Sequence, residues 1–336
     1  MNNRVTIIGA GSFGTAIAQI FADKKYVVKI YTKSREQAQE INEMKTNRYY
    51  FDDLIFTDQV EATTDLTTAI NFSKYIILAV PSDAIRAVCC DINKVLKLPK
   101  IFINVAKGLE PGTNKLLSEI IDEEIEEKGR TGVVVLSGPS HAEEIVKRYF
   151  TALVAVSKNE ALAKEVQYLF SNEYIRVYTS NDLVGVQVAA TVKNILAIAS
   201  GIIYGMGYGD NTRAALITRG LAEMVRYGRY KGVMLDTFFG LAGIGDLIVT
   251  ATSYHSRNFQ VGLKIGKGMS AQEALASSKT VVEGVRATEA VYQDIRQNNI
   301  DMPITVGVYQ ILFDNKDAKE VMDNIIKRQL KAEIIG

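Results

Sequence analysis

The sequence predicts an α/β protein in which an N-terminal, doubly wound parallel sheet is followed by a mainly α-helical C-terminal domain. Three observations predict this class: strand-like runs alternate with helical patterns early in the chain, a glycine-rich turn follows the first run, and strand-like alternation stops near residue 181. A chain of 336 residues is long for a single core, so two domains are expected. We expect the first over residues 1–181 and the second over residues 182–336.

The expected strands are short runs rich in β-branched and other apolar residues. In chain order they are Val5–Ile8, Val27–Tyr31, Tyr75–Ala79, Ile101–Val105, Val133–Leu136, Leu153–Val156 and Ile175–Tyr178. Helical patterns separate most of them, for example over Lys115–Glu127. Long helical periods dominate from Asp182 to the C-terminus, and they predict the helical second domain.

The turn over residues 9–14, Gly-Ala-Gly-Ser-Phe-Gly, joins the first expected strand to a helical pattern. Gly9 allows the tight turn out of the strand, Gly11 leaves room for a pyrophosphate against the backbone, and Gly14 lets helix and strand pack closely. The amides at the start of the helix then face the anion with the positive end of the helix dipole. Strand, motif and helix in this order predict a Rossmann dinucleotide-binding domain.

The composition favours a soluble, cytoplasmic protein that does not bind nucleic acid. The net charge is +1, whereas nucleic-acid binding usually needs a basic patch, and the N-terminus lacks a signal-peptide pattern. The longest apolar stretch, Leu183 to Gly209, has about 16 uncharged residues after Lys193, fewer than a membrane span needs, so we expect a buried helix. The adjacent Cys89 and Cys90 fit a reducing cytosol, and the cysteine and histidine spacing predicts no metal site.

The residues after the second expected strand favour NADP over NAD as the cofactor. In this fold, an acidic residue about 20 residues beyond the glycines usually binds the ribose 2′-hydroxyl. Here the strand ends without an acid, and Lys33 and Arg35 occupy that region. Cations suit a 2′-phosphate, which favours NADPH, although both residues could instead be ordinary surface charges at a helix start.

Two lysines are candidates for the chemistry. Lys193 is the only charged residue between Asp182 and Asp210, within an apolar helical pattern. A charge there is costly unless it is paired or takes part in chemistry, which favours general acid–base use over a lysine that reaches solvent at the helix edge. Lys107 follows an expected strand, at the sheet edge where ligands bind in this fold, although lysines are also common in loops.

Three further segments supply candidate site residues, and two of them have the composition of an anion site. Ser140 and Glu143 form a capping-box pattern, which can start a helix and also present amides to an anion. Asp246 lies in a turn of small residues, and Ser256-Arg257-Asn258 combines a helix cap, helix-start amides and a guanidinium. The last combination suits a phosphate, or else is an N-cap with an exposed arginine. His141 is given no role, because an isolated histidine is usually structural.

In combination, these segments resemble the bacterial NAD(P)-dependent glycerol-3-phosphate dehydrogenases. The resemblance rests on blocks in a specific order: Gly9–Gly14, Ala106–Glu110, Gly138–Glu143, Val192–Asn194, Asp210–Asn211 with Thr218–Gly220, Gly243–Asp246, Ser256–Asn258 and Val282–Gly284. The first block is generic to Rossmann enzymes, whereas the rest of the set is specific. Two positions depart from the family pattern: Phe51-Asp52 follow Tyr50 where Leu-Pro is frequent, and Lys33 stands where Arg or His is common.

The resemblance implies a role for each matching position, with Lys193 as the catalytic proton acceptor. The implied substrate contacts are Lys107, Gly138, Ser140, Lys193, Asp246, Ser256, Arg257 and Asn258. The implied cofactor contacts are Gly9, Gly11, Ser12, Phe13, Gly14, Lys33, Tyr50, Lys107, Ala142, Arg257, Val281 and Glu283.

The activity implied by the resemblance is reversible hydride transfer between sn-glycerol 3-phosphate and NAD or NADP. The ketone partner is dihydroxyacetone phosphate, and the implied destination of the product is glycerophospholipid synthesis. Two alternatives stay open: a β-hydroxyacid dehydrogenase, which would bind a carboxylate, and a non-catalytic NADP(H)-binding regulator. A homodimer is compatible with the sequence.

Overall fold

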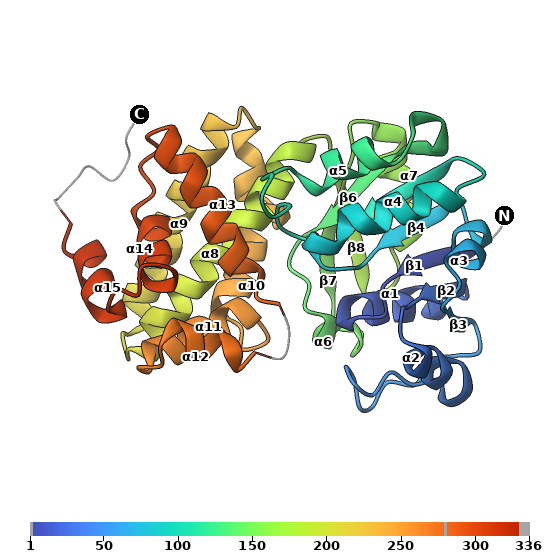
Figure 1. Cartoon of the computed structure of the whole chain (residues 1–336), viewed down its shortest axis with the longest axis horizontal. Coiled ribbons are helices and arrows are strands. Elements are labelled where there is room, and N and C mark those ends of the chain that lie inside the picture. Colours follow the sequence, from blue (N-terminus) through green and yellow to red (C-terminus); the bar gives the residue numbers. More distant parts are fainter. Residues whose placement is uncertain (1–2, 279–280, 329–336) are drawn as a thin grey trace. The chain divides into compact units, whose positions relative to one another are not determined.

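The structure, a computed structural model, describes residues 3–278 and 281–328 (Figure 1). The chain divides into two compact units. The first comprises Met1–Ala190 and Val233–Asp246, and the second comprises Thr191–Gly232 and Leu247–Gly336. All described strands belong to the first unit, and the described part of the second unit consists of helices and their connections.

One eight-stranded sheet forms the centre of the first unit. Its strands are β1 (Arg4–Ile8), β2 (Val27–Tyr31), β3 (Val60–Thr63), β4 (Tyr75–Leu78), β5 (Lys100–Asn104), β6 (Arg130–Ser137), β7 (Thr151–Val156) and β8 (Ile175–Ser180). Their order across the sheet is β3-β2-β1-β4-β5-β6-β7-β8, and neighbours are parallel except for the antiparallel pair β6 and β7. The chain order reverses between β1 and β4, and ligands of this fold bind at the carboxyl ends of strands beside such a reversal.

Each strand predicted from the sequence is present, which confirms the predicted α/β class. Strand β3 was missed because it has only four residues, of which only Val60 and Ala62 are buried. That alternation is too short to separate from a loop by pattern alone. The antiparallel direction of β7 departs from an all-parallel sheet, since a run of apolar residues carries no information about its direction.

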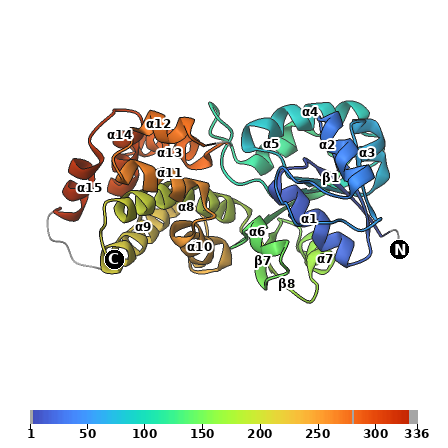
Figure 2. The ribbon, with the colours of Figure 1, turned by 90° about the horizontal axis from the view of Figure 1, so that it is seen from below.

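Helices cover both faces of the sheet, as a doubly wound fold requires (Figure 2). They are α1 (Ser12–Asp23), α2 (Arg35–Gln39), α3 (Leu66–Phe72), α4 (Ile85–Val95), α5 (Leu117–Glu124), α6 (Ala142–Ile145) and α7 (Glu160–Phe170). Short helical turns are η1 (Glu40–Met44), η2 (Ser82–Ala84), η3 (Glu127–Gly129), η4 (Leu235–Phe239) and η5 (Leu241–Gly245). Alternate strand residues serve the two faces: Ile7 packs in the core with α1 and α7, and Ile8 packs in the core with α4 and α5.

Long helices make up the second unit, which confirms the predicted change from strands to helices. They are α8 (Leu183–Gly205, from Thr191 onward), α9 (Asp210–Tyr230), α10 (Asp246–Thr252, from Leu247), α11 (Arg257–Gly266), α12 (Ala271–Ala276), α13 (Glu283–Gln297), α14 (Pro303–Leu312) and α15 (Ala318–Ile326). Helix α8 is long and apolar enough to cross a membrane by length and composition, but its most apolar stretch is entirely buried inside the structure. This burial confirms the prediction of a buried core helix.

Helices α8 and α11 cross with their backbones in contact. A Cβ atom on Gly201 would lie 2.2 Å from a backbone oxygen of α11, and one on Gly262 would lie 2.1 Å from a backbone oxygen of α8. Gly205 and Gly266, four residues further along each helix, make equally close backbone approaches of 2.4 and 2.1 Å. Glycines four residues apart lie on one face of a helix, so this spacing on both helices permits the crossing.

Candidate active site

The glycine turn has the shape predicted for a pyrophosphate site. Gly9 has a φ of +110°, and a Cβ there would lie 2.6 Å from the Ala79 carbonyl oxygen. A Cβ on Gly14 would lie 2.1 Å from the Gly9 carbonyl oxygen, so helix α1 can pack against the strand only through glycine. Among the described residues other than Gly11 and its chain neighbours, no heavy atom lies within 4 Å of a Cβ built on Gly11, which is the N-cap of α1. The turn therefore fits a dinucleotide pyrophosphate at the positive end of α1.

The other predicted cofactor contacts of the first unit include residues at the starts of two helices and residues that follow β2 in the chain. Ser12 and Phe13 form the first turn of α1, and Ala142 is the first residue of α6. Lys33 is exposed in the loop that follows β2, and Tyr50 is half-buried. Ser34 caps helix α2, and no acidic residue stands between the end of β2 and this cap.

The structure brings together four predicted substrate contacts around the ammonium group of Lys107. Lys107 Nζ donates to Asp246 Oδ2 at 2.8 Å and to the Gly138 carbonyl oxygen at 3.1 Å. Ser140 Oγ donates to that same carbonyl oxygen at 3.0 Å. The predicted capping box is wrong, because α6 begins at Ala142 with His141 as its N-cap, and Ser140 bonds back to the strand end instead.

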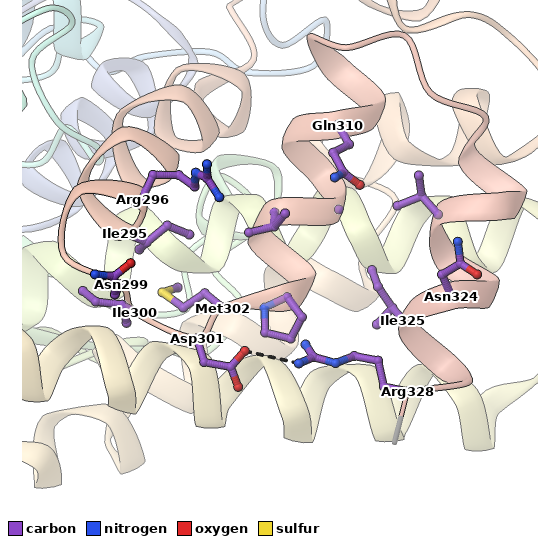
Figure 3. A pocket seen from close by; sticks show the side chains of 14 residues that line it. Ile295, Arg296, Asn299, Ile300, Asp301, Met302, Gln310, Asn324, Ile325 and Arg328 are labelled. Carbon is purple, nitrogen blue, oxygen red and sulfur yellow. Dashed lines mark hydrogen bonds and ion pairs between the residues drawn. The ribbon is translucent and has the colours of Figure 1, made fainter. Parts of the chain in front are cut away.

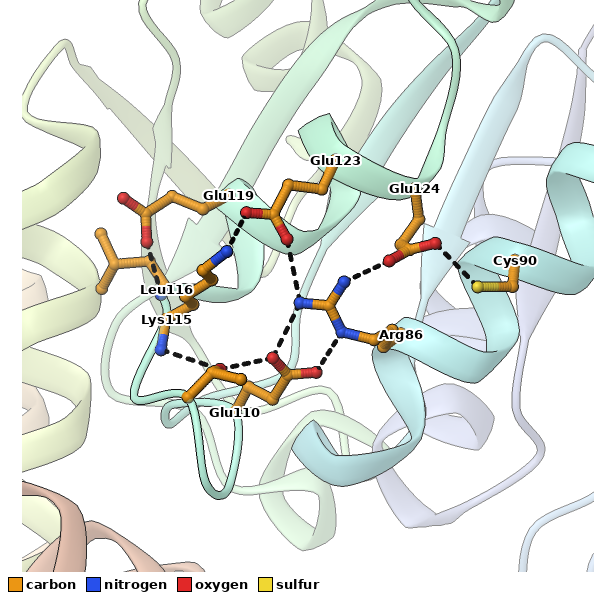
Figure 4. Close-up of polar contacts among 9 residues, drawn as sticks. Arg86, Cys90, Glu110, Lys115, Leu116, Glu119, Glu123 and Glu124 are labelled. Atoms are coloured by element: carbon orange, nitrogen blue, oxygen red, sulfur yellow. Dashed lines mark hydrogen bonds and ion pairs between the residues drawn. The ribbon is translucent and has the colours of Figure 1, made fainter.

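The loop that follows Lys107 is fixed by an ion pair that the sequence analysis missed (Figure 4). Arg86 on α4 holds both carboxylate oxygens of Glu110, with Nε at 2.6 Å and Nη2 at 2.8 Å. Its guanidinium also contacts Glu123 and Glu124 of helix α5. The Arg86 hydrogen bond holds the pKa of Glu110 below its usual value, so the carboxylate stays ionised and bidentate. A basic residue on α4 would have been the only sequence signal for this pair, and charged residues on helices are too common to be informative.

In the second unit, Lys193 lies on α8 and is buried, with 4% of the residue exposed. Its Nζ donates to Thr250 Oγ1 on α10 at 2.7 Å. This confirms that the lysine does not reach solvent at the helix edge. Thr250 was not predicted; its only sequence signal is a hydroxyl at the end of the apolar run that follows Asp246.

The Ser256-Arg257-Asn258 segment starts helix α11, as predicted. Ser256 Oγ accepts from the Phe259 amide at 3.3 Å, and Arg257 is exposed at the first helical position. The buried Asn258 side chain donates to Asn194 Oδ1 at 2.9 Å and accepts from the Gly284 amide at 2.9 Å. The segment is thereby tied both to the residue after Lys193 and to the start of α13.

Val281 and Glu283, the remaining predicted cofactor contacts, lie at the start of α13. Val281 is exposed, and Glu283 is the first residue of the helix, beside the Gly284 that Asn258 holds. The predicted residues thus form two groups, one in each compact unit. Among the described residues, no group of three histidine, cysteine or acidic side chains could hold a metal ion.

A separate pocket of about 620 Å³ lies among α13, α14 and α15 (Figure 3). Arg296, Asn299, Asp301, Gln310 and Arg328 are among the residues that line it, and Arg328 pairs with Asp301 at 3.3 Å. None of the residues predicted to bind substrate or cofactor lines this pocket.

Two family models match the chain. The model described as the N-terminus of NAD-dependent glycerol-3-phosphate dehydrogenase matches residues 4–163, and the model described as its C-terminus matches residues 182–323. Together these matches cover most of both units.

Curated relatives and a solved structure match over nearly the whole chain. Glycerol-3-phosphate dehydrogenase (NAD(P)+) of Staphylococcus haemolyticus is 46% identical over 330 residues, which are 98% of this chain and 99% of that protein. The enzyme of the same name from Staphylococcus epidermidis is 47% identical over the same shares. The crystal structure of glycerol-3-phosphate dehydrogenase from Coxiella burnetii has a TM-score of 0.91 and 34% identity, over 97% of this chain and 99% of that one.

Proposed function

The chain belongs to the NAD-dependent glycerol-3-phosphate dehydrogenase family, and from this we infer that it is an oxidoreductase that acts on sn-glycerol 3-phosphate with NAD or NADP. The reaction is a reversible hydride transfer at C2, with dihydroxyacetone phosphate as the ketone. The structural observation that carries this inference is the buried ammonium of Lys193, held by the Thr250 hydroxyl. A buried amine is costly for folding and useful for moving a proton, which favours an enzyme over a protein that only binds a dinucleotide.

Lys193 is assigned the proton transfer. When bound, the cofactor would supply the hydride for the carbonyl carbon in the reducing direction. As the new C–H bond forms, the carbonyl π electrons move to oxygen, and Lys193 Nζ gives that oxygen a proton to complete the alcohol. A proton delivered by a water molecule that enters the site would then restore the Lys193 ammonium group, and each of these steps would reverse for oxidation. The second cation, Lys107, orients the substrate and stabilises the developing negative charge.

The phosphate of the substrate is assigned to the start of α11. Arg257 supplies a guanidinium, and the amides at the helix start around Ser256 and Asn258 add the positive end of the helix dipole. Binding energy from the phosphate, remote from C2, then positions the carbonyl. Gly138, Ser140 and Asp246 complete the assigned substrate contacts.

Most of the dinucleotide contacts are assigned to residues 1–181 and most of the substrate contacts to residues 182–336. The glycine turn, Ser12 and Phe13 would hold the pyrophosphate, and Lys33 would contact the adenosine ribose, which favours NADPH over NADH. Tyr50, Lys107, Ala142, Arg257, Val281 and Glu283 are the further proposed cofactor contacts. We place the enzyme in the cytoplasm, where its product supplies glycerophospholipid synthesis, and a homodimer is compatible with this proposal.

The proposal is tested by following NADPH or NADH oxidation with dihydroxyacetone phosphate as substrate. Dihydroxyacetone is the matched control, because it has the same carbonyl without the phosphate. We expect rapid oxidation with the first and very slow oxidation with the second. Turnover of β-hydroxyacids without turnover of the phosphorylated ketone would favour a hydroxyacid dehydrogenase instead. Cofactor binding without turnover of any phosphorylated ketone would favour a regulator.

A further inference from the structure

The side-chain amides of Asn47 and Gln37 meet at the backbone of the glycine turn. Asn47 Nδ2 donates to the Ala10 carbonyl oxygen at 3.0 Å, and Gln37 Nε2 donates to the same oxygen at 2.9 Å. Ala10 is the residue between Gly9 and Gly11. Its carbonyl therefore has two hydrogen-bond donors that come from outside the turn, one from α2 and one from the segment after η1.

Both amides are themselves fixed by further hydrogen bonds. Asn47 is fully buried; its Nδ2 also donates to Thr15 Oγ1 on α1 at 2.8 Å, and its Oδ1 accepts from Gln37 Nε2 at 3.1 Å. Thr32 Oγ1, directly after β2, donates to Gln37 Oε1 at 2.6 Å. Rotation of either amide would leave buried polar atoms without partners, which is expensive, so the two side chains form a rigid support.

This support determines the direction of one peptide unit. In a planar trans peptide, the C=O bond of one residue and the N–H bond of the next point in opposite directions. The Ala10 carbonyl is held toward Asn47 and Gln37, so the Gly11 N–H points away from them. A Cβ added to Gly11 would meet no heavy atom within 4 Å among the described residues other than Gly11 and its chain neighbours.

We propose that Asn47 and Gln37 are positioning residues that aim the Gly11 N–H at the pyrophosphate of the dinucleotide. This proposal rests on the proposed function, since it requires that the turn bind a dinucleotide. Neither side chain touches the reacting atoms; both act through the peptide between Ala10 and Gly11. A donor that is held in place before binding does not have to be ordered at the moment of binding, which strengthens the contact.

The test compares a ligand that has the pyrophosphate with one that lacks it. Dissociation constants for ADP-ribose and for adenosine are measured by titration calorimetry on the wild type and on Asn47→Ala and Gln37→Met, together with thermal unfolding. In each variant we expect ADP-ribose binding to weaken about 10-fold, because a hydrogen bond to a charged group is misdirected. Adenosine binding should change by less than about 2-fold. A purely structural role would weaken both ligands equally.

Asn42→Ala is the matched control. Asn42 lies on η1, near Asn47 in the sequence, and its side chain bonds the backbone of Ala62 in β3 at 2.9 and 2.7 Å instead of the glycine turn. Both ligands should bind this variant as they bind the wild type. If Asn47→Ala does not fold, the binding data for Gln37→Met test the proposal. Gln37 is only half-buried, so we expect this variant to fold.

Two outcomes would overturn the proposal: unchanged ADP-ribose binding in folded variants, or equal losses for the two ligands. Failure of the wild type itself to bind ADP-ribose would instead contradict the proposed function. The two failures are therefore distinguishable.

Discussion

The ammonium group of Lys107 lies 2.8 Å from a carboxylate oxygen of Asp246, although the two residues are 139 positions apart. The side chain of Asp246 is 1% exposed and that of Lys107 is 16% exposed. An ion pair this well buried depends on both charges, because the removal of one takes away the ion-pair partner of the other. The pair also fixes the end of β6, since Lys107 bonds the Gly138 carbonyl as well.

Asp246→Asn should therefore reduce both stability and activity. We expect the free energy of unfolding to fall by about 3 kcal/mol, as for other broken buried pairs, and kcat/KM for dihydroxyacetone phosphate to fall as Lys107 loses its orientation. Adding Lys107→Met should recover part of the stability but none of the activity. Urea unfolding and steady-state kinetics measure these changes in stability and activity for Asp246→Asn, for Lys107→Met and for the double variant. Strictly additive losses of stability would show that the two side chains are not coupled.

Lys193→Met should separate catalysis from folding. The variant keeps the apolar stem and removes the amine, so kcat should fall by about 10²–10⁴ while cofactor binding persists. Lys100→Met is the matched control, since Lys100 is also a buried lysine, 5% exposed, whose Nζ donates to the Ser73 carbonyl at 2.7 Å. The Lys100→Met protein should be less stable than the wild type and should keep the wild-type kcat. A folded Lys193→Met protein that retains more than about a tenth of kcat would contradict the assignment.

Arg257→Ala should weaken recognition of the substrate phosphate. The loss of a charge-assisted contact should raise KM and lower kcat/KM by roughly 10- to 100-fold. Stability should hardly change, because Arg257 is exposed. Lys264→Ala, a basic residue on the same helix α11 that bonds Ser277 at 2.7 Å, serves as the control and should leave KM unchanged. An Arg257→Ala enzyme with wild-type kinetics would place the phosphate elsewhere.

Replacing Lys33 and Arg35 together by alanine should change the choice between cofactors. Both side chains are exposed, so they are available to a 2′-phosphate without a loss of packing. NADPH affinity should fall on the order of 10-fold, while NADH, which lacks that phosphate, should be affected much less. Fluorescence titration with each cofactor gives the two dissociation constants. Equal losses would mean that neither side chain contacts the 2′-phosphate.

Glu223 should make stability depend on pH. Its carboxylate on α9 accepts from the amides of Ile304 and Thr305 at the start of α14, at 2.6 and 3.1 Å. Burial raises the pKa of Glu223 to about 7 from an ordinary value of 4.5. The folded state therefore binds a proton more tightly than the unfolded state does. The contribution of Glu223 to the free energy of unfolding is fully present below pH 4.5 and is lost as the pH rises through 7.

Urea unfolding at intervals from about pH 5 to pH 8 measures this dependence. The wild type should lose roughly 3 kcal/mol across the window from Glu223, and Glu223→Gln should remove that part of the slope. Glu289→Gln, an exposed position on α13, should leave the slope unchanged. A Glu223→Gln protein with the wild-type slope would show that another group titrates.

The features that the sequence predicted correctly are those that depend on residues close together in the chain. The β-branched runs predict the strands, the glycine spacing predicts the turn, and a lone lysine in an apolar helix predicts a buried ammonium group. Strand β3 was missed because four residues are too few for a pattern, and the direction of β7 depends on its connection rather than on its own residues.

The contacts that organise the candidate site join residues far apart in the chain, and no local pattern encodes them. Asn258 bonds Asn194 from 64 positions away, and Arg86 holds Glu110 across 24 positions. Asn47 reaches Ala10 across 37 positions. The residues of these pairs are common polar types. Their pairing can therefore be recognised only in the folded structure, where the two side chains lie next to each other.

Because α8 and α11 touch through their backbones, main-chain atoms set the distance between these two helices. Gly201 and Gly262 bring the backbones together without intervening side chains, so no rotamer change could widen or narrow the gap. The backbones that carry Asn194 and Asn258, whose side chains are joined by a hydrogen bond of 2.9 Å, are therefore held at a fixed separation. Any larger residue at Gly201 or Gly262 would push the two helices apart, because its Cβ would lie 2.2 or 2.1 Å from a backbone oxygen of the facing helix.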